Sequence, residues 1–462
     1  MSTYGYDKNT TPYLDKISKQ ATLYKNAIAS SYWTLPSTAS LFTGTYTSTH
    51  YLIRNGDKLD NKYVTLPEYL NKKGYQCIGL SPNPFVSKYS KLDRGFHIFD
   101  DYYKESIKHK LNDITEHFFE GSSGDKKDGQ INKIYNKISD YDVFKQFYWM
   151  ITGNFDKFAT SINKKIKYYL QNRSKNKPFF IYAHYTETHS PYVVPNKFRS
   201  KFIDDKDTKP WRINQDYFNY YTSDEKLNEK EFNIIRSIYD GTISYLDEKV
   251  YDIYTYLEKN NLLKDTILII TSDHGDQLGE KKLFFHVFSL YDTLVKIPLI
   301  IKFDDNTRID SIENNIVQNT DIFPTILNLL NEKNQDINRQ IQGNSLLNKK
   351  NQKRGDYAIS ELYKPFGPRL IKYRHKLKQF DKKLLAIRNN EKKYIYSSNG
   401  MHELYDIKYD KLEKDNLYNN NFDLEKDFKN NEVKDWITTF NLVSKYDKSI
   451  NDIEKEILFR IK

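Results

Sequence analysis

Short apolar runs alternate with segments of helical periodicity along this chain, and this alternation limits its possible folds more than any other feature. Residues 66–72 and 243–257 repeat apolar side chains at helical spacing. The apolar runs are bounded by turn residues and have the length of buried strands; they lie at 76–80, 179–183, 266–270 and 298–301. This alternation predicts an α/β fold with a largely parallel central sheet flanked by helices. Ligand sites in such sheets gather at the carboxyl ends of the strands.

The domain organisation follows from length and from changes in local character. At about 150 residues per domain, the 462 residues suit two or three domains, or one large domain with a smaller satellite. We predict a main domain over residues 1–350, with a helical insertion at about 102–177. A small α+β region at 356–462 follows and ends in an amphipathic helix with Ser449 as its N-cap. The polar, aromatic stretch 201–231 fits a lid and an ordinary surface excursion equally well.

Charge and cysteine content exclude several partners and cofactors. The formal net charge is +11, but the 72 Lys and Arg residues are interspersed with acids and amides. A solvated surface explains this pattern better than a nucleic-acid site does. Cys77 is the only cysteine, so neither an internal disulfide nor a cysteine-based zinc cluster can form. We therefore expect a cytoplasmic protein, and no apolar run reaches the roughly 20 residues of a transmembrane segment.

Asp273 and His274 follow the apolar run 266–270 almost directly, so a carboxylate and an imidazole emerge together where the expected strand ends. Oxygen and nitrogen ligands side by side suit zinc, manganese, magnesium or calcium. An aspartate at a strand end is more often a helix cap or a turn former. The pair alone is therefore a weak signal for a metal site.

Thr34 stands just before a predicted helix whose early positions include Pro36. The N-terminus of a helix offers free backbone N–H groups and a positive dipole end, which favour a tetrahedral anion beside this hydroxyl. A plain threonine N-cap explains the same residues, and it is the better interpretation when Thr34 is considered alone.

Three histidines lie near expected strand ends. His184 and His189 follow the run 179–183, and His286 comes shortly after the Asp273 and His274 pair. Such histidines can bind a metal or a substrate oxyanion, although each one taken alone is better explained as a hydrogen-bonded structural residue.

Taken together and in order, these segments resemble the sulfatase family of the alkaline-phosphatase superfamily. The resemblance runs from nearly the first residue to about Leu417. It is carried by Tyr4 to Tyr6, 10–15, 33–44, 184–192, 239–241, 271–280, 291–292 with 297–298, 321–325 and 403–406. An ordered set of this size is far more specific than any one of its members.

The resemblance implies a role for each candidate residue. Thr34 would be the nucleophile and also a metal ligand, and Asp273 and His274 would bind a divalent metal ion. His189 and His286 would face the ester group of the substrate. Substrate binding would involve His184 and Asn55. The implied reaction is in-line attack on the sulfur or phosphorus of a small-molecule, glycan or lipid ester, with a histidine protonating the leaving oxygen.

The nucleophile position departs from the family pattern. Typical sulfatases carry a cysteine or serine there, oxidised to formylglycine, and an arginine where this chain has Thr38. Thr34 cannot give that aldehyde because its β-carbon bears a methyl group, so we do not expect formylglycine. Phosphodiesterases and phosphoalcohol transferases of the superfamily use an unmodified threonine, which shifts weight toward phosphate esters.

The start of the chain also departs from the pattern. In the family, an apolar strand that ends in metal-binding acidic residues precedes the segment matched by Tyr4, whereas only Met1, Ser2 and Thr3 precede it here. We therefore expect a central strand and one or two metal ligands to be lacking.

Three hypotheses remain. The leading one is a metal-dependent hydrolase of sulfate or phosphate esters. The second is a phosphodiesterase or phosphoalcohol transferase that uses Thr34, and the third is an inactive homologue that acts as a binding protein.

Overall fold

The computed structural model describes most of the chain, in several stretches. These are residues 1–102, 156–203, 213–224, 226–304, 312–332, 334–347, 356–365, 370, 373–419 and 432–445. The chain divides into two compact units, each built from separate stretches of sequence. Unit 1 comprises Met1–Lys16, Gly74–Ser87 and Phe96–Leu262, and unit 2 comprises Ile17–Lys73, Lys88–Gly95 and Leu263–Lys462.

Unit 1 is built on a small parallel sheet. Its three strands lie in the order β3-β2-β4, with β2 at Gln76–Ser81, β3 at Ile98–Asp101 and β4 at Phe179–Ala183. The helices of this unit are α1 (Pro12–Ser18), α8 (Ala159–Asn172), α9 (Asn196–Arg199), α10 (Tyr217–Thr222) and α11 (Glu229–Lys259). β4 is an edge strand, and each of its side chains is only half-buried.

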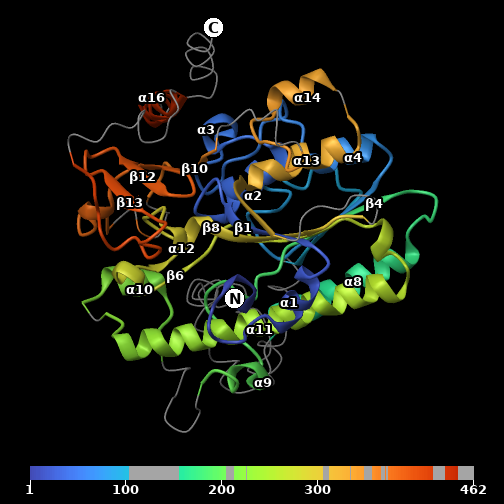
Figure 1. Ribbon diagram of the computed structural model, residues 1–462, viewed down its shortest axis with the longest axis horizontal. Coiled ribbons are helices and arrows are strands. Elements are labelled where there is room, and N and C mark those ends of the chain that lie inside the picture. Colours follow the sequence, from blue (N-terminus) through green and yellow to red (C-terminus); the bar gives the residue numbers. More distant parts are fainter. Residues whose placement is uncertain are drawn as a thin grey trace, which may run out of the picture. The chain divides into compact units, whose positions relative to one another are not determined.

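The longest helix, α11, organises unit 1 (Figure 1). Its start is fixed by a capping box between Asn228 and Glu231. Further along, Asp240 accepts hydrogen bonds from the Tyr6 hydroxyl at 3.1 Å and from the Lys8 ammonium at 2.9 Å. One side of this helix therefore ties the first residues of the chain to unit 1.

Unit 2 contains a mixed sheet. Its four strands lie in the order β5-β8-β1-β9, with β1 at Thr22–Ile28, β5 at Leu268–Thr271, β8 at Lys296–Lys302 and β9 at Ile312–Gln318. β8 runs antiparallel to β1 and β5, whereas β9 is parallel to β1. The helices of this part are α2 (Thr34–Thr43), α3 (Thr47–His50), α4 (Leu66–Lys72), α12 (Asp292–Val295), α13 (Ile322–Leu329) and α14 (Gln335–Gln340).

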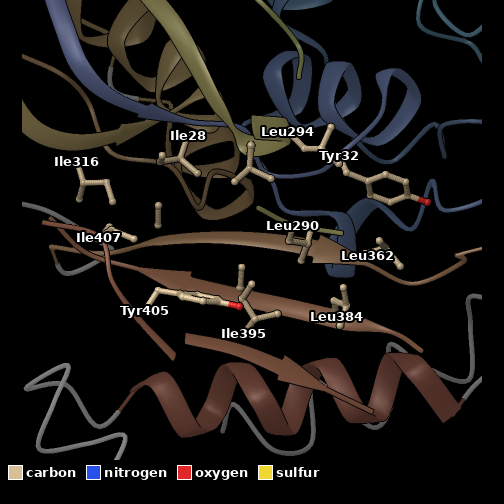
Figure 2. Packing of buried hydrophobic residues seen from close by; sticks show 13 residues of the cluster. Ile28, Tyr32, Leu290, Leu294, Ile316, Leu362, Leu384, Ile395, Tyr405 and Ile407 are labelled. Carbon is tan, nitrogen blue, oxygen red and sulfur yellow. The ribbon is translucent and has the colours of Figure 1, made fainter. Parts of the chain in front are cut away.

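A second sheet in unit 2 is an antiparallel meander near the end of the chain. Its strands are β10 (Ala358–Leu362), β11 (Leu384–Arg388), β12 (Lys392–Ser397) and β13 (Glu403–Asp406), and helix α16 (Glu432–Lys445) follows them. One face of this sheet packs its apolar side chains against residues of β1, β9 and α12; Ile28, Leu294, Ile316, Leu384, Ile395 and Tyr405 are among them (Figure 2). Burial of this kind stabilises the fold by about 25 cal/mol for each Å² of apolar surface removed from water.

The prediction of an α/β fold is confirmed, although the sheet of unit 2 is mixed rather than parallel throughout. The small C-terminal region is an antiparallel sheet with a helix. Most of the expected insertion at 102–177 and all of the expected helix after Ser449 lie outside the described residues. The domain boundaries at 350 and 356 stay predictions. Among the described residues, no helix is both long and apolar enough to cross a membrane.

Candidate active site

Asp273 and His274 lie just past the end of β5, as the sequence predicts. The strand end is held by Thr271, whose hydroxyl donates to the Pro298 carbonyl of β8 at 2.8 Å. The backbone N–H of Gly275 then donates to the Leu294 carbonyl at 2.7 Å. A Cβ atom at Gly275 would lie 2.2 Å from the Thr293 carbonyl oxygen, so only glycine permits this approach. The motif is thereby fixed against α12.

Thr34 is the first residue of α2 and is 4% exposed. Trp33 is the N-cap and makes no side-chain capping bond, so a threonine N-cap is not the explanation for Thr34. The Thr34 Oγ1 atom lies 3.3 Å from Nε2 of His274. Residues 240 positions apart therefore form one site within unit 2.

Ser37, which no sequence pattern singled out, holds helix α2 next to the segment that follows β5. Its hydroxyl donates to the Asp273 carbonyl at 2.5 Å and accepts from the Asn319 amide at 2.9 Å. Asn319 also accepts a hydrogen bond from the backbone of Ser30 at 3.0 Å. The only signal for Ser37 in the sequence is its spacing, since it lies one helical turn after Thr34 on the same face.

The donor atoms at this point suit a divalent metal ion. The Nδ1 atom of His274 lies 2.8 Å from the Gly275 carbonyl, so Nδ1 carries the proton and Nε2 keeps its lone pair. Oδ2 of Asp273 lies 3.5 Å from that Nε2 atom. A carboxylate, an imidazole nitrogen and the Thr34 hydroxyl thus converge. Among the described residues, no cluster of three or more His, Cys, Asp or Glu side chains completes a metal site.

A short hairpin carries the second histidine of the site, His286. Its strands are β6 (Gln277–Leu278) and β7 (Phe284–Phe285), with Asp276 directly before β6 and His286 directly after β7. Nδ1 of His286 lies 2.8 Å from Oδ1 of Asp276, and the rings of His286 and His274 are 4.4 Å apart. Burial lowers the pKa of His286, although the Asp276 carboxylate opposes this shift. The neutral ring therefore donates from Nδ1 to Asp276, which leaves Nε2 as an acceptor.

Gln277 is completely buried, and its side chain forms hydrogen bonds with the second half of the hairpin and the residues after it. Its amide nitrogen donates to the carbonyls of Phe285 at 3.0 Å and Val287 at 3.1 Å, and its oxygen accepts from the Ser289 hydroxyl at 2.8 Å. Gln277 and Asp276 are both part of the site that sequence reasoning did not identify. Their position immediately after the Asp273 and His274 pair is the signal that could have found them.

The other two predicted histidines belong to unit 1, in the loop that follows β4. Nδ1 of His184 lies 2.9 Å from the Tyr182 hydroxyl, and its Nε2 lies 3.4 Å from the Asn83 amide. Nδ1 of His189 lies 2.5 Å from the carbonyl of Ser190. Their assignment to the site stays a prediction.

Asn55 is exposed in a turn of unit 2. The Asp57 carboxylate closes that turn by accepting from the backbone N–H groups of Ile53 at 2.9 Å and Arg54 at 2.7 Å. No contact described for Asn55 joins it to Thr34 or His274, so its role in substrate binding stays a prediction.

Two family models match the chain. The model described as "Sulfatase" matches residues 1–332, and the one described as "N-sulphoglucosamine sulphohydrolase, C-terminal" matches residues 279–435. Because the first match covers more than half of the sequence, the chain belongs to the sulfatase family.

Individual relatives agree with this assignment. A multifunctional alkaline phosphatase superfamily protein, PehA, from Trinickia caryophylli is 25% identical over 88% of this chain and 85% of its own length. The choline-sulfatase of Rhizobium meliloti is 24% identical over 88% of this chain and 78% of its own length. The crystal structure of a phosphonate monoester hydrolase from Agrobacterium radiobacter shares the fold, with a TM-score of 0.69, 17% identity, and coverage of 96% of this chain and 93% of that one. The predictions of a sulfatase-family protein and of an enzyme that hydrolyses sulfuric or phosphoric esters are confirmed.

Proposed function

We propose that this chain hydrolyses phosphate esters with Thr34 as an unmodified nucleophile. The observation that carries the proposal is that Oγ1 of Thr34, the first residue of α2, lies 3.3 Å from Nε2 of His274. The similarity to phosphonate monoester hydrolase in fold and to a multifunctional alkaline phosphatase superfamily protein supports a phosphorus ester, while the similarity to choline-sulfatase keeps sulfate esters as the alternative.

The environment of Thr34 suits a tetrahedral anion. The first turn of α2 presents backbone N–H groups and the positive end of a ten-residue helix. Asp273 and His274 would hold the divalent metal ion that the family implies, which when bound would lower the pKa of the nucleophile and shield the non-bridging oxygens. Calcium, manganese, zinc and magnesium all accept this donor set.

The reaction needs one proton acceptor and one proton donor. Neutral His286, with its N–H directed to Asp276, keeps Nε2 available to accept a proton. In the first step the Thr34 hydroxyl gives its proton to Nε2 of His286 while its Oγ1 atom forms a bond to phosphorus, and the bond from phosphorus to the leaving oxygen breaks. The electron pair goes to that oxygen, which takes a proton from a protonated histidine; His189 is our candidate. A water molecule then releases phosphate from Thr34, whereas an alcohol in its place would make the protein a transferase.

The test is turnover of aryl phosphate, phosphodiester, phosphonate monoester and aryl sulfate substrates with each divalent metal added in turn. We expect the phosphorus esters to be cleaved fastest. Thr34→Val should abolish turnover because it keeps the side-chain shape and removes the hydroxyl. The matched control is Thr43→Val on the same helix, where the hydroxyl bonds only to Ala39 and Thr45. Full activity in Thr34→Val, or cleavage of aryl sulfate alone, would contradict the proposal.

A further inference from the structure

The hairpin that carries Asp276 and His286 cannot be rigid by itself. Its ladder joins only Gln277 to Phe285 and Leu278 to Phe284, and a hairpin of this size is marginally stable in water. Four non-glycine residues between its turn and the segment after His286 also have left-handed backbone conformations: Lys281 (φ 52°), Lys282 (φ 59°), Phe285 (φ 68°) and Phe288 (φ 67°). Each costs of order 1 kcal/mol and persists only where the surroundings impose it.

Lys281, at the tip of the turn, reaches the rings of Tyr291 and Tyr405 in unit 2, which together we call the cage. Its Nζ atom lies 4.5 Å from the centre of the Tyr291 ring and 4.8 Å from that of Tyr405. It also donates a hydrogen bond to the Tyr405 hydroxyl at 3.2 Å. The two rings are nearly perpendicular, at 75°. An ammonium group placed against two aromatic rings gains a cation–π attraction to both.

Residues of the C-terminal sheet hold the two rings of the cage in place. Tyr405 is 2% exposed and belongs to the apolar cluster of that sheet (Figure 2). One oxygen of the Glu403 carboxylate accepts from both tyrosine hydroxyls, at 2.8 Å for Tyr291 and 2.6 Å for Tyr405. Its other oxygen lies 3.6 Å from the ammonium of Lys382. The two rings are therefore held in place by contacts that do not involve Lys281, and Lys281 reaches them from the hairpin turn.

We propose that Lys281 is a positioning residue for His286. The contact between its ammonium and the Tyr291–Tyr405 cage holds the hairpin turn, and the hairpin in turn holds Asp276 and His286 against His274. The catalytic consequence rests on the proposed function, whereas the positioning itself does not. The side chain of Lys281 thereby links the C-terminal sheet to the site.

The variant that tests this is Lys281→Ala. It keeps an L-residue at a left-handed position, so the backbone strain is nearly unchanged, and the groups lost are the ammonium and the methylenes that carry it. We expect kcat to fall about tenfold with little change in KM, because substrate binding elsewhere is kept and a histidine is misplaced. Lys281→Arg should restore most of the activity, since a guanidinium also binds aromatic rings. Methylammonium chloride should restore part of the activity of Lys281→Ala, whereas the same concentration of sodium chloride should not.

The matched control is Lys408→Ala. Lys408 also lies over a tyrosine ring, at 5.5 Å from the centre of Tyr409, and it too belongs to unit 2. No contact described for it reaches the hairpin, so this variant should keep the parent activity. Wild-type activity in Lys281→Ala, or an equal loss in Lys408→Ala, would overturn the proposal.

A second measurement separates this proposal from the proposed function. Hydrogen exchange of the peptide covering 276–288 reports on the hairpin directly, including the bond from the Gly279 N–H to the Leu283 carbonyl at 2.9 Å. We expect faster exchange there in Lys281→Ala and not in Lys408→Ala, even if no ester is turned over. Unchanged exchange in Lys281→Ala would show that Lys281 does not hold the hairpin.

Discussion

Two histidine-bearing segments invite comparison, one in each unit. The segment 273–286 follows β5 and the segment 184–192 follows β4; both strands are apolar, half-buried edge strands of their own sheets. In the first segment the histidines meet each other and Thr34. In the second, Nδ1 of His184 lies close to the Tyr182 hydroxyl and its Nε2 to the Asn83 amide, and Nδ1 of His189 lies close to the Ser190 carbonyl.

A carboxylate anchors each segment, but in a different way. Asp276 accepts a hydrogen bond from the His286 ring itself, so it orients the side chain that we propose as the proton acceptor. Glu187 is 2% exposed and accepts from the backbone N–H of Ala159, at the start of α8, at 2.8 Å. It therefore fixes the path of the backbone rather than a ring. The difference teaches that two similar strand ends use their carboxylates differently: in segment 273–286 the carboxylate orients a histidine ring, whereas in segment 184–192 it fixes the backbone.

The largest effect should come from Asp273→Ala. We expect turnover to fall at least about 1,000-fold, because one of the proposed metal ligands is removed. The protein should also lose bound metal, measured by elemental analysis after gel filtration. His184→Ala in the other segment should keep its metal. Retention of metal by Asp273→Ala would mean that the metal binds elsewhere, and a parent protein that binds no metal would favour the inactive binding homologue.

The next effect compares His286→Ala with His189→Ala. If each moves a proton in the reaction, each should lower kcat about 10²- to 10⁴-fold. Steady-state kinetics on an aryl phosphate would measure both variants. Parent-like activity in His189→Ala would break the assignment of that histidine and leave the catalytic groups in unit 2.

Asp276→Asn should have a smaller effect, with kcat lowered about tenfold and thermal stability nearly unchanged. The amide keeps the shape of the carboxylate but no longer favours the tautomer that frees Nε2 of His286. Kinetics and a thermal melt on the same sample would separate the two properties. A large drop in melting temperature with normal kcat would mean that Asp276 supports the fold instead.

Glu187→Gln should leave kcat unchanged and alter the pH dependence of stability. Burial, followed by the charge of Asp156, raises the pKa of Glu187 to about 7 from its ordinary 4.5. The folded state therefore holds a proton that the unfolded state releases, so this group's contribution is fully present below pH 4.5 and is lost as the pH rises through 7. The Gln variant should lack that loss and be more stable than the parent at pH 8, by about 3 kcal/mol. Urea-unfolding curves of the parent and of Glu187→Gln at pH 5 and pH 8 would test this. The same change in stability between the two pH values in both proteins would refute it.

Sequence patterns determined a good part of this protein. The apolar runs 179–183 and 266–270 fall on β4 and β5, and the ordered motifs are enough by themselves to identify the family. Antiparallel pairing of β8 was not predictable, because a buried run such as 298–301 looks the same in either direction. Helix α16 was not expected either, since its amphipathic pattern follows a polar, Asn-rich stretch.

The site shows the same division more sharply. The sequence by itself determined that Asp273 and His274 leave a strand together, because local residue order decides what a strand end presents. Only the tertiary structure decided that Thr34 meets His274, that Ser37 fastens Asp273, and that Lys281 reaches Tyr405. Contacts between residues so far apart depend on register, helix placement and side-chain packing, and no local pattern encodes them. The residue types that the proposed reaction needs could be predicted from the sequence, whereas the contacts that bring them together could not.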